Sequence, residues 1–241
     1  MKKIIVIQII AIFLLASCQF GSLKIINHEK PNIQTDFSPF KNIGCNESHG
    51  YENWYRCEEG SPLLDLGCNS IENMPLLGGL TPGYPTAACT LEIDETVWTA
   101  DIPTDCIYND GGFITLCHRF VIYKEGKYQV VKTMDDFRKL FAPVDSPDEA
   151  LSFALAFSDY FASYGQTKRD DYVYSVKELE DTFVETDAIG YLVHVFYTRT
   201  FGCGPFETNA VEIKVTYNGN VEEISRHPVY RDPSEDNMCA D

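Results

Sequence analysis

The stretch SPDEALSFALAFSDYFASY, residues 146–164, carries the strongest folding signal in the chain. Ser146 suits the N-cap of a helix, Pro147 its first turn, and Glu149 the third position of a capping box. A glycine follows the stretch, as is typical of helix C-termini. Apolar residues surround most of the cylinder, so the sequence predicts a helix over residues 147–164 that is buried against a sheet.

Four segments downstream of this helix predict that sheet, because each is rich in β-branched and aromatic residues. The Asn218-Gly219 pair predicts a two-residue turn that would place Ile213 opposite Ile224 and Lys214 opposite Glu223. The strands are expected at about 182–186, 190–200, 209–217 and 221–225, within 182–226 overall.

Upstream, Thr133 and Asp136 resemble a capping box and predict a short helix over residues 134–141. Residues 133–241 should therefore form an α+β module, with a helix packed on a four-stranded antiparallel meander. From 146 to 226 this plan looks like the helix-on-curved-sheet modules of cystatin-like and PepSY-like envelope proteins. The resemblance concerns architecture alone and implies no functional residues.

Residues 45–132 have a different composition, with short apolar runs, many turn signals and six cysteines. They predict a disulfide-rich part built of β-hairpins and irregular segments. A hairpin centred on Gly111-Gly112 would set Cys106 opposite Cys117, and a second hairpin should turn at Glu125-Gly126.

Cys18 belongs to the N-terminal export signal described below, which leaves eight other cysteines. An even number of cysteines in an exported chain predicts disulfides. Cys203 is expected to pair with Cys239. No C-x-x-C pair is present and the histidines lack metal spacing, so neither a metal site nor a cofactor is predicted. The disulfide candidates are Cys45, Cys57, Cys68, Cys89, Cys106, Cys117, Cys203 and Cys239.

The N-terminus has the order of an export signal: Lys2-Lys3, an apolar run, then Leu15-Ala16-Ser17-Cys18. The apolar run of residues 4–16 spans roughly 20 Å as a helix, too short for a bilayer core of about 30 Å. The last four residues resemble the lipobox of bacterial lipoproteins.

This resemblance implies a signal peptide over residues 1–17, acylation of Cys18 (palmitate among the chains), and a lipid-anchored protein of the cell envelope. Residues 18–44 would be a flexible tether. Gln19, rather than aspartate, after the acylated residue favours the outer membrane if the host has one.

The mature chain of 224 residues carries a formal charge of −19, since it retains 17 basic and 36 acidic residues. Such a charge argues against binding to the nucleic-acid phosphate backbone. The expected contact with the membrane is the lipid anchor, because basic patches for anionic headgroups are lacking.

The function that these observations favour is a binding or assembly module at the membrane surface, with an envelope protein, a peptide or a glycan as partner. Tyr51, Trp54 and Tyr55 are the candidate binding aromatics. No catalytic residue is assigned, and an enzyme is less favoured. The alternatives are an envelope hydrolase that uses Cys203 or an unrecognised carboxylate pair, and a structural spacer without a ligand.

Overall fold

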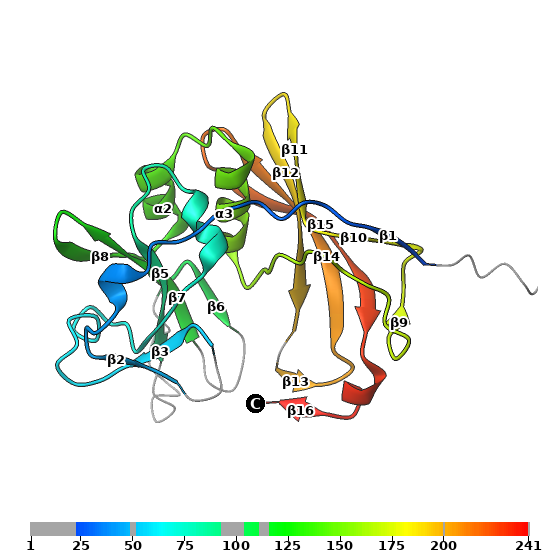
Figure 1. Ribbon diagram of the computed structural model, residues 1–241, viewed down its shortest axis with the longest axis horizontal. Helices are drawn as coiled ribbons and strands as arrows, with labels where there is room; N and C mark the ends of the chain where they lie inside the picture. Colours follow the sequence, from blue (N-terminus) through cyan, green and yellow to red (C-terminus); the bar gives the residue numbers. More distant parts are fainter. Residues whose placement is uncertain (1–22, 49–51, 93–103, 111–115, 200, 241) are drawn as a thin grey trace, which may run out of the picture.

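The computed structural model describes residues 23–48, 52–92, 104–110, 116–199 and 201–240. Within these ranges the chain is mostly β, with two α-helices and four disulfides. The helices pack between an N-terminal antiparallel sheet and a C-terminal curled sheet (Figure 1). The signal peptide, the lipobox and Tyr51 lie outside the described residues.

The N-terminal sheet has seven strands, and all its described pairs are antiparallel. Its order is β2-β3-β4-β5-β7-β6, and β8 also pairs with β7. The strands are β2 (Cys45–Glu47), β3 (Trp54–Cys57), β4 (Ser70–Glu72), β5 (Thr86–Glu92), β6 (Tyr108–Asp110), β7 (Leu116–Lys124) and β8 (Lys127–Val131). The predicted turn at Glu125-Gly126 is confirmed, because Lys124 pairs with Lys127.

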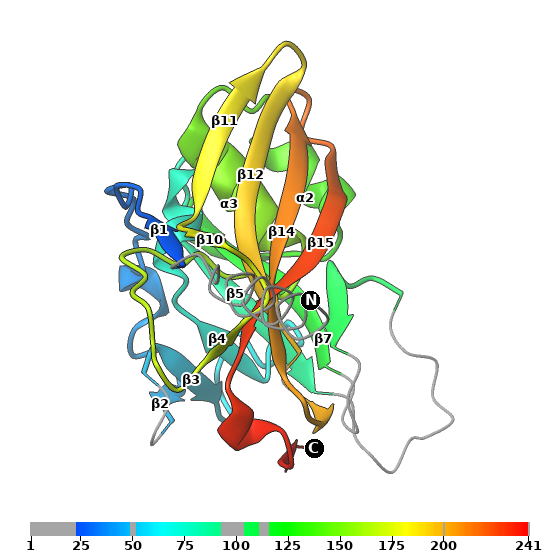
Figure 2. The same cartoon turned by 90° about the vertical axis from the view of Figure 1, so that its right-hand side faces the viewer.

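The C-terminal sheet is a five-stranded curled half-barrel (Figure 2). Its order is β11-β12-β14-β15-β9, so the four predicted strands are neighbours in sequence order and a fifth joins them at one edge. The prediction of four strands was therefore one strand short. The members are β9 (Val173–Tyr174), β11 (Phe183–Asp187), β12 (Gly190–Thr198), β14 (Glu207–Thr216) and β15 (Val221–Arg231).

Shorter elements complete the described chain. The parallel pair of β1 (Lys24–Ile26) and β10 (Glu178–Glu180) lies beside the C-terminal sheet, and β13 (Gly202–Cys203) pairs with β16 (Cys239–Ala240). The 3-10 turns are η1 (Ser38–Phe40), η2 (Pro75–Gly79) and η4 (Pro233–Glu235).

The two α-helices begin where their capping signals place them. Helix α2 spans Met134–Phe141 as predicted, and the Thr133 side chain accepts a hydrogen bond from the Asp136 backbone N–H. Helix α3 begins at Pro147, and Ser146 Oγ accepts from the Glu149 backbone N–H at 3.2 Å. In each helix a side chain three residues away satisfies a backbone N–H of the first turn, so the start of the helix is decided locally.

The end of α3 differs from the prediction, because the helix spans Pro147–Phe157 and stops seven residues before Tyr164. Ser158 is fully extended, and Phe161 forms an antiparallel bridge with Phe196 of β12. Each of these two phenylalanines donates its backbone N–H to the other's carbonyl at 2.9 Å. Pairing with a strand distant in sequence thus replaces the last two turns that the apolar pattern predicted.

The turn between β14 and β15 also differs from the prediction. Ile213 pairs with Glu223, and Lys214 with Glu222, one residue away from the predicted register. The Gly219 N–H donates to the Thr216 carbonyl, and Gly219 has a φ of +79°. This is a type I turn followed by a left-handed glycine, so the loop is one residue longer than the two-residue turn that Asn-Gly signals.

All eight candidate cysteines form disulfides, and the two pairings that were predicted, Cys106–Cys117 and Cys203–Cys239, are confirmed. The bridges are Cys45–Cys57, Cys68–Cys89, Cys106–Cys117 and Cys203–Cys239. The predicted geometry of the third bridge was wrong, since Asn109 of β6, and not Cys106, lies opposite Cys117 of β7.

The main apolar core contains residues from both halves of the chain. Ile122 of β7, Phe153 of α3, Val193 of β12 and Ile213 of β14 are each at most 1% exposed within one cluster. The boundary predicted at residue 132 therefore lies within a shared core. A smaller cluster behind the N-terminal sheet contains Cys45, Cys57, Cys68 and Cys89.

The segment that we term the arm, residues 23–34, packs on the molecule, contrary to the tether predicted over residues 18–44. Its β1 strand pairs with β10, and Ile33 is buried in the main core. Further along, Phe37 and Phe40 fill the smaller core. The apolar residues of this segment are spaced without a period, so their burial is decided by the surface that the arm crosses.

Candidate binding site

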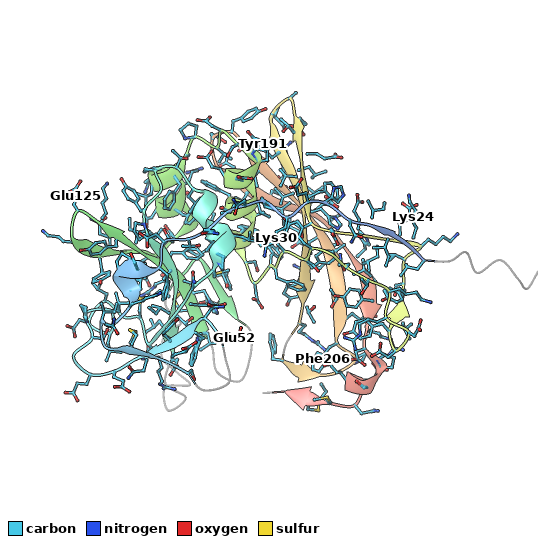
Figure 3. All side chains as sticks on the ribbon, in the orientation of Figure 1. Lys24, Lys30, Glu52, Glu125, Tyr191 and Phe206 are labelled. Carbon is cyan, nitrogen blue, oxygen red and sulfur yellow. A yellow bond between two sulfur atoms is a disulfide. The ribbon has the colours of Figure 1, made fainter. Side chains whose placement is uncertain are left out.

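The arm is held to the C-terminal half by its backbone and by one buried carboxylate. Figure 3 allows the arm to be followed from Lys24 to Lys30. Strand β1 runs parallel to β10 as far as Ile26, whose carbonyl accepts a hydrogen bond from the Asp181 N–H at 2.8 Å. Asp181 lies directly after β10 and is fully buried.

The Asp181 carboxylate accepts four hydrogen bonds from two separate segments. In the loop beyond α3, the backbone N–H groups of Gly165 and Gln166 donate at 2.7 and 3.1 Å. In the arm, Asn27 Nδ2 and the His28 N–H donate at 3.1 and 3.2 Å. Burial raises the pKa of Asp181, but these hydrogen bonds outweigh it and leave the pKa below its usual value. The charged form therefore ties the arm to the loop.

Beyond His28 the arm leaves the strand direction, and the outer edge of β11 has no strand paired to it among the described residues. A hollow of about 430 Å³ and another of about 250 Å³ lie along this path. The smaller one is lined by residues 28, 29 and 31 of the arm, 147, 148 and 151 of α3, Tyr164, and 182–184. It opens at the strand edge itself, since both Phe183 and Val184, which point to opposite faces of the sheet, line it.

The smaller hollow combines an apolar wall with negative charge. Among its lining residues Pro31, Leu151 and Val184 are apolar, while Asp148 and Glu29 are acidic. Burial, with the charges of Asp148 and Asp181, raises the pKa of Tyr164 to about 12. The Tyr164 hydroxyl therefore remains protonated at neutral pH and can act as a hydrogen-bond donor.

The larger hollow shares Asp148 with the smaller one and continues it along the arm. Its other lining residues are Asn32, Ile33, Gln34, Gly78 and Gly79. A Cβ on Gly78 would lie 2.1 Å from the Gln34 carbonyl oxygen, so only glycine permits this approach of η2 to the arm. The two hollows share Asp148 and follow each other along the arm, and we term them together the edge groove.

The aromatic residues predicted to bind a ligand are not brought together by the fold. Trp54 and Tyr55 are consecutive in β3, so their side chains point to opposite faces of the sheet. Tyr55 packs at 5.1 Å from the Phe37 ring and borders the smaller core. Tyr55 therefore contributes to packing of the smaller core, and Trp54 and Tyr55, the two described residues of the predicted group, do not form a common binding surface.

A pair of carboxylates lies on another part of the molecule. Glu72 of β4 is exposed to solvent, yet the surrounding protein raises its pKa, mainly by desolvation and then by the negative charge of Asp159. His118 opposes this shift and stacks on Tyr108 at 4.4 Å. Glu72 and Asp159 are therefore candidates for the carboxylate pair of the hydrolase alternative. Cys203 is excluded as a nucleophile because its sulfur is bonded to Cys239.

In the part of the chain that the structure describes, no group of three or more metal-binding side chains is present, and no helix is long and apolar enough to cross a membrane.

Sequence reasoning missed the edge groove for identifiable reasons. Asp148 lies in the first turn of the predicted helix, where a carboxylate favours the helix dipole, and Tyr164 was predicted as the last residue of that helix. Because α3 ends at Phe157, Tyr164 lies in the loop beyond the helix, where it lines the hollow. The acidic run Glu178–Asp181 was the one signal that could have drawn attention to this region.

Comparison of the chain with protein-family models, curated proteins and solved structures finds no match to any of them.

Proposed function

We propose that this chain is an acylated protein of the bacterial cell envelope that binds a partner protein at the edge groove. The anchor rests on the lipobox at residues 15–18, and the four disulfides fit a compartment outside the cytoplasm. The observation that carries the binding role is the outer edge of β11, which no described strand pairs with, beside a preformed hollow. An edge strand offers backbone groups to another chain, and native proteins usually cover or blunt such edges.

The linker that precedes the arm is short, so an acylated Cys18 would hold the fold close to the membrane. The four residues between Cys18 and Leu23 make five Cα–Cα steps, which reach at most about 18 Å when fully extended. Because the chain packs on the fold from the arm onward, the anchor would hold the domain within that distance of the lipid headgroups. A partner that is itself membrane-bound would then meet the groove at high effective concentration. Gln19 favours the outer membrane as the location in a host that has one.

The anchor makes a direct prediction. Cys18→Ser should abolish incorporation of an alkyne-tagged fatty acid and leave unprocessed precursor, since the acylated thiol is lost. Ser17→Ala, which keeps a small residue beside the cysteine, should retain the label. Metabolic labelling followed by in-gel fluorescence measures both, and equal labelling of Cys18→Ser and wild type would refute the anchor.

The binding role is tested by site-specific photo-crosslinking in cells that produce the acylated protein. Benzoylphenylalanine at Thr186, exposed on β11, should give a discrete higher-mass adduct. The same residue at Ser225, exposed on β15, should not give that adduct. Identical adducts from both positions, or none from Thr186, would contradict the proposal and favour the structural-spacer alternative.

A further inference from the structure

We infer that the edge groove takes an extended peptide segment that adds as a strand to β11 and places a lysine or arginine side chain in the smaller hollow. The inference rests on the proposed function and names the chemistry of the partner at that site. It is built on the arrangement of backbone and charge around Phe183 and Val184.

The backbone part of the inference comes from the path of the arm. Strand β1 pairs with β10, but at Asn27 and His28 the arm turns to Asp181 and does not continue along β11. Pro31, which borders the hollow, has no N–H to donate to a strand. Among the described residues the β11 edge is therefore left for a second segment, and main-chain hydrogen bonding to such an edge supplies affinity without sequence preference.

The side-chain part comes from the lining of the smaller hollow. A strand added to β11 projects alternate side chains to either side, and one of them reaches a hollow that begins at Val184. Its apolar wall suits the methylene stem of a long side chain, whereas the carboxylates of Asp148 and Glu29 suit a cationic end. The oxygen of the Tyr164 hydroxyl can in addition accept a hydrogen bond from that cation.

Among the described residues, the basic side chains near the hollow do not fulfil this role. His28 lines the hollow, but its Nε2 lies 2.8 Å from Glu180. Lys30 is exposed and is not among the lining residues. Arginine and lysine are both compatible with the lining, because a volume of about 250 Å³ accommodates either side chain.

The inference is tested by fluorescence anisotropy with the full acylated protein in detergent micelles and a labelled probe peptide. The probe is an acetylated, alternating valine–threonine pentapeptide with lysine at its centre. One control peptide has norleucine in place of lysine, which keeps the apolar stem and removes the charge. A second has N-methyl groups on alternate residues, which prevents strand pairing.

We expect the lysine peptide to bind, the norleucine peptide to bind about fivefold more weakly, and the N-methylated peptide about tenfold more weakly or not at all. Asp148→Asn should remove most of the preference for lysine over norleucine. Asp170→Asn, at a side chain that is 96% exposed and away from the groove, should retain it.

Equal binding of the lysine and norleucine peptides, equal binding of the N-methylated peptide, or no binding of the lysine peptide at millimolar concentration would each overturn the inference. If crosslinks still form at Thr186 in such a case, the groove has a partner of different chemistry and the proposed function remains. If those crosslinks are also absent, the proposed function fails as well.

Discussion

Asp181→Asn is expected to lower the free energy of unfolding by about 2–4 kcal/mol at pH 7, because one buried carboxylate accepts four hydrogen bonds. The substituted amide retains one acceptor oxygen and turns an N–H₂ group toward backbone donors. The arm should loosen first, since Asn27 and His28 depend on this carboxylate. Urea denaturation measures the stability, and the rate of tryptic cleavage after Lys24 reports release of the arm.

The pH dependence gives this prediction a second test. The pKa of Asp181 is lowered in the folded state, so its contribution is complete above the unfolded value near 3.8 and is lost as the pH falls through the folded pKa. The stability difference between wild type and Asp181→Asn should therefore shrink below about pH 4. Asp170→Asn is the matched control, expected to change stability by less than about 0.5 kcal/mol. A difference that is constant from pH 7 to pH 3 would show that the carboxylate charge is not responsible.

Reduction of the disulfides is expected to unfold β2, β3 and β4 while α3 keeps its structure. Four of the ten buried residues of the smaller core are cysteines in the Cys45–Cys57 and Cys68–Cys89 bridges. Losing each bridge costs roughly 2–4 kcal/mol. The main core contains no cysteine and buries the helix on several sides. Hydrogen exchange should show lost protection in Trp54–Cys57 and Ser70–Glu72, and retained protection from Ala150 to Phe157.

The control for this experiment is the double variant Cys203→Ser/Cys239→Ser, which removes only the bridge between β13 and β16. It should leave exchange in both sheets unchanged outside this corner. Loss of protection in α3 together with β3 on adding reductant would mean that the two cores unfold as one cooperative unit.

Much of the fold was predictable because the relevant signals act over a few residues. The N-caps at Thr133 and Ser146 bond to backbone groups three positions away, so their sequence patterns are sufficient. In the Glu125-Gly126 turn both residues have a positive φ, and glycine adopts this conformation without steric cost, so Gly126 marks the turn in the sequence. The even number of cysteines and their spacing also led to the two bridges that were predicted as pairs.

The candidate site was not predictable in the same way. The lining of the smaller hollow comes from the arm, from the first turn of α3, from Tyr164 and from the start of β11, up to 156 residues apart in the chain. No local period connects such segments, and each has an ordinary interpretation when it is considered alone. The aromatic group around Trp54 was conspicuous in the sequence, yet strand alternation separates its members.

The sequence by itself determined where both α-helices begin, which cysteines could close local loops, and the lipobox that predicts the anchor, because each depends on neighbouring residues. Tertiary structure alone decided that α3 ends at Phe157, that the arm packs on the fold, and that β11, beside an acidic hollow, is an edge strand of the described sheet. The physical reason is that backbone groups and carboxylates take whichever partners the folded chain brings near. For Phe161 that partner is Phe196, and for Asp181 the partners lie in the arm and in the loop beyond α3.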